Sequence, residues 1–237
     1  GEAPITESIR IGGSIGYGEL VDGQDTDGDW LGDFQFSESQ SDTDGDVTLG
    51  DINVYYQVLQ DTVQSQSFVL DAFVGYQEYQ DDLNDTDGVQ TIENERKVNQ
   101  PFPGLDSTYK FDWQVLRLGA RGELQFDPAF TLRGSVAYLY LLNYEGKAFW
   151  NLREDFRRES PNFVHDADSG SGVEIKCSAR LKLTDNLFIE GGYWLFSMTA
   201  EDGTDTIYFA DGTQGKSDLS EVNSLRHGVF GGITYGF

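Results

Sequence analysis

Apolar and polar residues alternate with a period of two along eight segments of the chain. In one segment, Val173 and Ile175 alternate with Glu174 and Lys176, and the pattern continues to Leu183. Strict alternation predicts a β-strand whose two faces meet different surroundings. Strands of about 9–11 residues suit a tilted crossing of a membrane. The eight segments cover residues 9–17, 51–58, 68–77, 116–121, 130–140, 173–183, 187–196 and 225–237.

The alternation alone leaves open which face meets water, because a soluble, ligand-carrying barrel has the same period. Here the polar rows hold glycines and charges of both signs, which suit a narrow, crowded interior. Short turns alternate along the chain with long polar segments, as in outer-membrane barrels. The short turns lie near residues 61–66, 127–128 and 184–186. The long segments, which we predict to be acidic extracellular loops, lie near residues 21–46, 80–107, 143–172 and 199–220.

We therefore predict an all-β fold: an antiparallel, up-and-down transmembrane β-barrel of about eight strands, forming one domain over residues 1–237. The interior of such a barrel is just wide enough to be filled by side chains. Charges there need partners, so we expect a salt-bridged plug rather than an open pore. The basic residues on the inward rows are Arg10, Arg117, Arg121, Arg133, Lys176, Arg180, Lys182 and Arg226. The acidic residues facing them are Asp51, Asp71, Glu123, Glu174 and Glu190.

Aromatic residues near the strand ends are expected to form the girdles that mark the two membrane interfaces. The chain also stops at an aromatic residue, Phe237, in an amphipathic last strand, which resembles the assembly signal of outer-membrane barrels. The expected girdle residues are Tyr17, Tyr56, Tyr76, Phe111, Trp113, Phe126, Phe130, Tyr140 and Tyr193.

Composition narrows the function classes. The chain of 237 residues has 41 acidic and 16 basic side chains, a net charge of −25, and a pI near 4.1. Nucleic acid is excluded as a partner, because phosphate binding needs a basic surface. A single cysteine, Cys177, excludes a disulfide framework. No apolar run reaches the roughly 18–20 residues of a membrane helix. Gly1–Pro4 lacks the features of a signal peptide, so we expect a mature product.

A specific resemblance arises at the first long segment. Asp27-Gly28-Asp29-Trp30 follows a glycine-rich strand, and Phe73–Gln77 reads Phe-Val-Gly-Tyr-Gln. Both are similar to motifs of the omptins, outer-membrane proteases with a ten-stranded barrel. The resemblance begins at Ile9 and implies that Asp27 and Asp29 match the family's catalytic aspartate pair. The family's opening hairpin has no counterpart here, so we expect either an eight-stranded relative or a ten-stranded barrel whose first two strands precede Gly1.

The resemblance fails at the other half of the family's site. Omptins carry an Asp-x-His dyad after the Asp-Pro turn, but residues 143–150 contain no histidine. The histidine in that segment is His165, beside Asp166. Carboxylates alone in an exposed loop are poor bases at neutral pH. We therefore favour a non-catalytic role, with an omptin-like endopeptidase using Asp27, Asp29 and His165 as the alternative.

Calcium binding is a second hypothesis for the same segments. Asp-Thr-Asp-Gly occurs three times, at residues 25–28, 42–45 and 85–88. Alternating aspartates followed by glycine are typical of calcium loops, because hard cations need several oxygen ligands and glycine allows the bend. The candidate ligands are Asp25, Asp27, Asp29, Asp42, Asp44 and Asp46. The alternative is that acidic loops keep the surface hydrated.

We expect a monomer in the outer membrane of a Gram-negative bacterium, with extracellular loops and periplasmic termini. Its expected role is binding through the acidic loops or support of the membrane. Its expected partners are outer-membrane lipid, including lipopolysaccharide, and an extracellular protein or cation. The endopeptidase is the first alternative, and a small pore is the second.

Overall fold

The computed structural model describes residues 1–63 and 66–235, and it is built from eleven β-strands. Eight strands are long and correspond to the eight predicted ones; three are short, with three to six residues each. The long strands are β2 (Ile9–Leu31), β3 (Phe34–Val63), β4 (Gln66–Glu93), β6 (Ser107–Gln125), β7 (Phe130–Phe149), β9 (Ser169–Lys182), β10 (Leu187–Tyr208) and β11 (Gln214–Tyr235). The short strands are β1 (Glu2–Pro4), β5 (Arg96–Pro101) and β8 (Phe163–Ala167). Phe237 and the centre of the predicted turn 61–66 lie outside the described residues.

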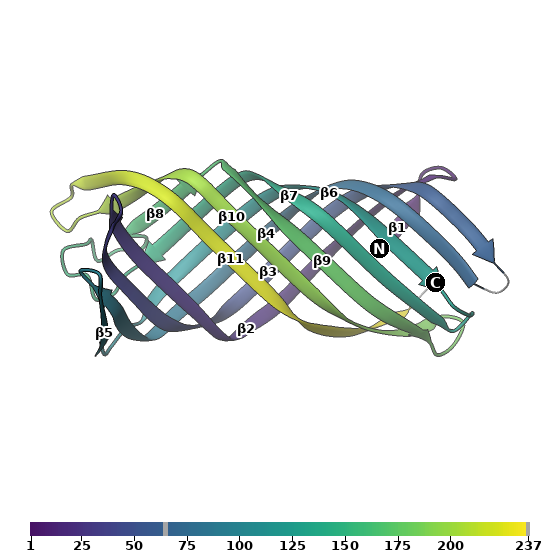
Figure 1. Ribbon diagram of the computed structural model, residues 1–237, viewed down its shortest axis with the longest axis horizontal. Coiled ribbons are helices and arrows are strands. Elements are labelled where there is room, and N and C mark those ends of the chain that lie inside the picture. Colours follow the sequence, from purple (N-terminus) through teal and green to yellow (C-terminus); the bar gives the residue numbers. More distant parts are fainter. Residues whose placement is uncertain (64–65, 236–237) are drawn as a thin grey trace.

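The strands form one antiparallel sheet in chain order, curled into a barrel with strongly tilted strands (Figure 1). Both termini lie toward the end that also carries the short turns, here named the short-turn end. The opposite end, which includes β5 and β8, is the long-loop end. Within the described residues, β2 and β11 share no strand pairing. The outer edge of β2 pairs instead with β1, at residues 10–12.

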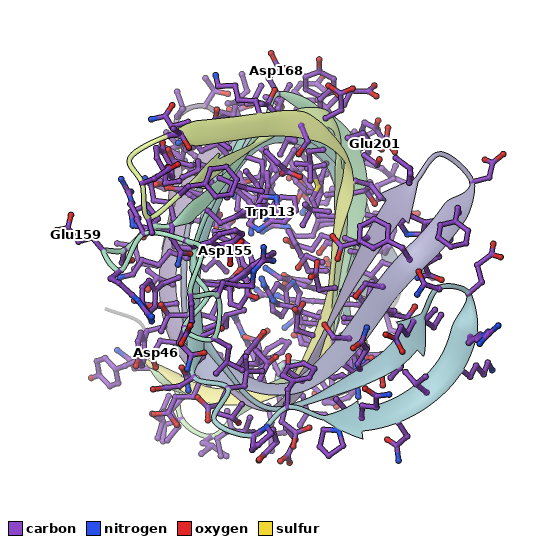
Figure 2. All side chains as sticks on the ribbon, turned by 90° about the vertical axis from the view of Figure 1, so that its left-hand side faces the viewer. Asp46, Trp113, Asp155, Glu159, Asp168 and Glu201 are labelled. Atoms are coloured by element: carbon purple, nitrogen blue, oxygen red, sulfur yellow. The ribbon has the colours of Figure 1, made fainter. Side chains whose placement is uncertain are left out.

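The predicted loops are largely strands. Residues 21–31 continue β2, residues 34–46 open β3, and the two pair along almost their whole length. The β2–β3 and β4–β5 hairpins lean outward at the long-loop end (Figure 2). These segments lack an apolar row because no lipid faces them, which is why their strand character is hidden in the hydrophobic pattern. The backbone pairs nevertheless, since pairing satisfies its hydrogen-bonding groups.

The outer face of the barrel is apolar around its middle. The side chains of Ile15 and Val229 are 90% and 88% exposed, and the other outward residues of these rows are mostly Leu, Ile, Val and Tyr. Cys177 is on this face, as predicted. An apolar exterior around a charged interior suits lipid and is the reverse of a soluble barrel. The soluble, ligand-carrying alternative is therefore wrong.

Ion pairs fill the interior at the level of this apolar belt. Arg117 lies near the centre, with Glu174 at 2.7 Å, Asp51 at 3.6 Å and the Asn53 amide oxygen at 3.0 Å. Seven of the eight predicted basic residues have an acidic partner in the interior, as the need to pair charges there required. Lys182 pairs instead with Asp185, which is exposed in the turn after β9. The pairs are Arg10 with Asp71, Arg117 with Glu174, Arg121 with Asp71, Arg133 with Glu123, Lys176 with Glu174, Arg180 with Glu190, Lys182 with Asp185, and Arg226 with Asp81.

Above the ion pairs, toward the long-loop end, large apolar side chains close the interior. Trp113 is 1% exposed and lies near the centre of the ring in Figure 2. Its indole packs 4.3 Å from the ring of Tyr144, and Tyr79 stacks on Phe196 at 5.1 Å. These four residues are named here the aromatic floor. The prediction that Trp113 belongs to an interfacial girdle is wrong: it occupies the inward row of β6 together with Val115 and Arg117. The girdle prediction is also wrong for Phe111, which packs against the buried core.

Among the described residues, no helix has the length and apolar character needed to cross a membrane.

Candidate functional site

A β-bulge aims the first acidic segment into the mouth of the barrel. Below the bulge, even-numbered residues of β2 such as Arg10 and Ser14 face the interior. Pairing with β3 then shifts between Leu20 and Gly23, leaving one extra residue on β2. Asp22 has a left-handed backbone, with φ of 56°. A bulge of this kind reverses which residues point inward.

As a result, Asp25, Asp27 and Asp29 face the space enclosed at the long-loop end, here named the mouth. The charges of residues on other strands act on these carboxylates: His165 on Asp25 and Asp27, Asp205 on Asp27 and Asp29. Without the bulge, the same three aspartates would point away from the mouth.

The opposite wall is re-aimed in a similar way. On β10, Met198 and Ala200 are buried in the interior, whereas beyond Asp202 it is Gly203 that pairs with Leu219, a core residue of β11. Asp202 itself has φ of 55°, in the left-handed region that aspartate tolerates better than most residues. This change of phase turns Asp205 toward the mouth.

Asp205 meets His165 there. The two residues are register partners on β10 and β8, and the Nδ1 atom of His165 lies 2.8 Å from Oδ1 of Asp205. The contact is an ion pair when the imidazole is protonated, and the ring N–H is not aligned as a strict hydrogen bond. The ring of Phe163 packs against the imidazole at 4.4 Å and 66°, so the histidine is held from two sides.

Several carboxyl groups lie close together at the mouth, and their pKa values are raised. Asp27 is open to water on one side, yet protein surrounds it on the others, and this burial raises the pKa of Asp27 to about 6. The charge of Asp29 raises that pKa further, while the His165 imidazole acts in the opposite direction. The pKa of Asp29 is also raised by burial, and Arg153 opposes that shift. A carboxylate with such a pKa is a better base near neutrality than an ordinary aspartate.

Asp85 on β4 lies next to Asp25 and is bound to β3. Its carboxylate accepts hydrogen bonds from Thr43 Oγ1 at 2.7 Å and from Ser41 Oγ at 3.1 Å. Burial, followed by the charge of Asp25, raises the pKa of Asp85 to about 6. Burial also raises the pKa of Asp25, whose side chain interacts with that of Asp85.

A structured loop, residues 150–162, borders the mouth on the side of His165. Trp150 stacks on Phe163 at 4.8 Å and on Phe156 at 5.7 Å. The buried amide of Asn162 holds the backbone of Trp150 through two hydrogen bonds, at 2.9 and 3.2 Å. Arg153 lies over Phe156 and makes two hydrogen bonds to Asp155, at 2.9 and 2.8 Å. Asp155 lies in front of the mouth in Figure 2, whereas Glu159 points away from the barrel.

The candidate calcium ligands do not gather in one place. Asp25, Asp27 and Asp29 face the mouth, whereas Asp42, Asp44 and Asp46 are exposed on the other face of β3, because Thr43 between them points inward. Asp46 accepts a hydrogen bond from the Tyr17 hydroxyl at 2.5 Å. In the described part of the chain, no three acidic, histidine or cysteine side chains converge on a common point that suits a metal ion. Calcium binding therefore remains a prediction.

The structure brings together Asp27, Asp29 and His165, the three residues of the endopeptidase alternative, and adds Asp205, which sequence reasoning missed. The omptin dyad is an Asp-x-His within one strand; here the two residues come from neighbouring strands 40 positions apart in the chain. No local motif marks Asp205. The register of β8 against β10 would have been needed to find it.

Comparison with known proteins agrees with this fold. No curated protein matches the chain by sequence. Among solved structures, the outer membrane protease OmpT from Escherichia coli matches with a TM-score of 0.77 and 16% identity, covering 97% of this chain and 79% of that one. At this identity the match shows a shared barrel fold. The sequence model of a family described as Pom, Protochlamydia outer membrane protein, matches residues 1–237. The chain therefore belongs to the Pom family of outer-membrane proteins.

Proposed function

We propose that this protein is an outer-membrane endopeptidase whose site consists of Asp27 on one wall of the mouth and the His165–Asp205 pair on the other. The observation that carries the proposal is the facing arrangement of a carboxylate of raised pKa and a histidine in contact with a second carboxylate. A general base needs a pKa near the working pH and an orienting partner. The non-catalytic prediction rested on the lack of an Asp-x-His dyad, and the contact between His165 and Asp205 supports the endopeptidase instead.

The proposed chemistry is hydrolysis by a water molecule held between the two walls. Asp27 takes up one proton of this water as the water oxygen attacks the scissile carbonyl, and this proton passes to His165. His165 then gives a proton to the leaving amine, and Asp205 stabilises the imidazolium formed in between. Asp29 adds to the negative charge at the mouth, which favours peptides with basic residues at the cleavage site.

In this proposal the long-loop end faces the outside of the cell and the short-turn end faces the periplasm. The mouth then meets extracellular peptides, and the apolar belt is surrounded by outer-membrane lipid, including lipopolysaccharide.

Cleavage of a dibasic fluorogenic peptide by the barrel, refolded with lipopolysaccharide, tests the function. We expect turnover by the wild type and its loss in Asp27→Asn and His165→Ala. Asp166→Asn is the matched control, because Asp166 is next to His165 but exposed on the other face of β8. The absence of turnover in the wild type would contradict the proposal.

A second candidate is a non-catalytic barrel that binds a cation or a basic protein through its acidic outer face. It is favoured by Asp22, Asp42 and Asp44, which line one hollow beside the bulge. Calcium is the simplest probe: a rise in thermal stability with millimolar calcium, lost in Asp42→Asn/Asp44→Asn, would support this role. An unchanged melting curve would contradict it for calcium.

A further inference from the structure

A hydrolytic site also needs a group that stabilises the negative oxygen formed when water attacks a carbonyl. Asp27, Asp29 and Asp205 have the wrong charge for this task, and His165 is engaged with the water proton. Among the described residues at the mouth, Tyr109 on β6 offers a neutral hydroxyl donor.

Strand register places Tyr109 at the level of the dyad. Tyr109 pairs with Leu83 on β4 and with Ala148 on β7, and Ala148 pairs in turn with Phe163 on β8. Phe163 is two residues from His165 on the same strand face, and its ring contacts the imidazole. With strands about 4.8 Å apart, Tyr109 and Phe163 are separated by roughly 10 Å along the wall.

The Tyr109 side chain is held within the site by aromatic neighbours. Its ring stacks on Phe111 at 5.7 Å, and its hydroxyl lies beside the indole N–H of Trp150, although the two are not aligned as a strict hydrogen bond. Trp150 also stacks on Phe163, so it contacts groups on both sides of the site. This row of rings connects the hydroxyl of Tyr109 to the imidazole of His165.

The surroundings keep the hydroxyl protonated. Burial raises the pKa of Tyr109 strongly, and the charges of Asp25, Asp85 and Asp27 raise it further. A phenol in this setting does not act as a base, but it remains a hydrogen-bond donor at every working pH.

We propose that the Tyr109 hydroxyl donates the hydrogen bond that stabilises the oxyanion during peptide cleavage. The inference rests on the proposed function. The water oxygen bonds to the carbonyl carbon and its proton passes by way of Asp27 to His165. The carbonyl oxygen becomes the oxyanion, which accepts a hydrogen bond from Tyr109. The C–N bond then breaks, His165 protonates the amine, and the oxyanion returns to a carbonyl. Tyr109 keeps its own proton throughout.

Tyr109→Phe tests the inference, because it removes one hydroxyl and keeps the ring. Loss of a single oxyanion donor lowers kcat by about 10²- to 10³-fold. We expect that loss with little change in KM, at all pH values. Tyr138→Phe, the same change on the outward face of β7, is the matched control. Heat-modifiable migration on gels verifies that both variants fold.

Binding gives a readout that does not depend on turnover. A phosphinic peptide mimics the tetrahedral oxyanion, whereas the amine product released by cleavage does not. Tyr109→Phe is expected to weaken binding of the phosphinic peptide by a similar factor and to leave binding of the product unchanged. If the wild type cleaves and kcat is unaltered in Tyr109→Phe, the inference is overturned while the function stands. If the wild type cleaves no peptide, the function falls, and the inference falls with it.

Discussion

The imidazole of His165 lies 2.8 Å from the carboxylate of Asp205, and the two residues are opposite each other on paired strands. In the omptin motif both members of the dyad come from one strand, with one residue between them. Here the pair depends on the register of β8 against β10. Its geometry is therefore as rigid as the sheet, even though its members are distant in the sequence.

The first prediction concerns this pair. Asp205→Asn keeps the shape of the side chain but removes the charge that stabilises the imidazolium. We expect kcat for peptide cleavage to fall by about 10²- to 10⁴-fold, the range of general acid–base contributions. Steady-state kinetics measures the effect, with Asp218→Asn on β11 as a control of equal charge change. A variant as active as the wild type would show that Asp205 takes no part.

The second prediction is a pH dependence. The pKa of Asp27 is raised to about 6, and Asp27 must be ionised to act as a base. Activity should therefore rise with pH, with a midpoint near 6 rather than near the ordinary aspartate value. Since the charge of Asp29 contributes to the shift, Asp29→Asn should move the midpoint to lower pH. Profiles of kcat/KM measure both. Asp33→Asn, at the exposed hairpin tip, should leave the midpoint in place.

The third prediction concerns stability and pH at Asp85. The folded state raises the pKa of this buried carboxyl to about 6, so folding favours its protonated form. Its contribution to stability is thus lost as pH rises from about 4 to above 6. Asp85→Asn cannot ionise, so its melting temperature relative to wild type should be higher at pH 8 than at pH 4. An equal difference at both pH values would refute the assignment.

The fourth prediction concerns the ion pairs inside the barrel. Arg117 and Glu174 are both buried, and removing one of them leaves the other charge without its main partner. We expect Arg117→Met to lower the free energy of unfolding by about 3–5 kcal/mol. Arg117→Met/Glu174→Gln should cost less than the two single losses combined. Urea unfolding in detergent micelles measures these values. Arg158→Met, whose acidic neighbour Glu154 is exposed and 4.0 Å away, should be close to neutral.

The fifth prediction concerns the bulge in β2. Deleting Asp22 removes the extra residue and turns Asp25, Asp27 and Asp29 to the opposite face. We expect a folded barrel that does not cleave peptide. Asp22→Gly, which suits a φ of 56°, should fold and cleave like the wild type. Full activity in the deletion variant would mean that these aspartates do not need to face the mouth.

The long strands and the outward apolar rows were predictable because alternation is a local signal, repeated over many residues. The paired interior followed from elementary electrostatics, since charges such as Arg117 require partners there. The girdle prediction for Trp113 relied on its residue type and ignored its position in the alternation. Trp113 lies on the same inward row of β6 as Arg117.

The site was only half predictable. Asp27 and Asp29 are marked by a short motif, but the motif does not show which face they occupy. That depends on one extra residue, Asp22, and on its left-handed backbone. Asp205 gave no local signal, because its role arises from the pairing of β8 with β10, a non-local property of the sheet.

The aromatic floor affects the passage of molecules through the barrel. Trp113, Tyr79, Tyr144 and Phe196 plug the shaft directly beneath the mouth, with a second obstruction of ion pairs below them. A molecule that visits the mouth therefore arrives and departs on the same side of the membrane.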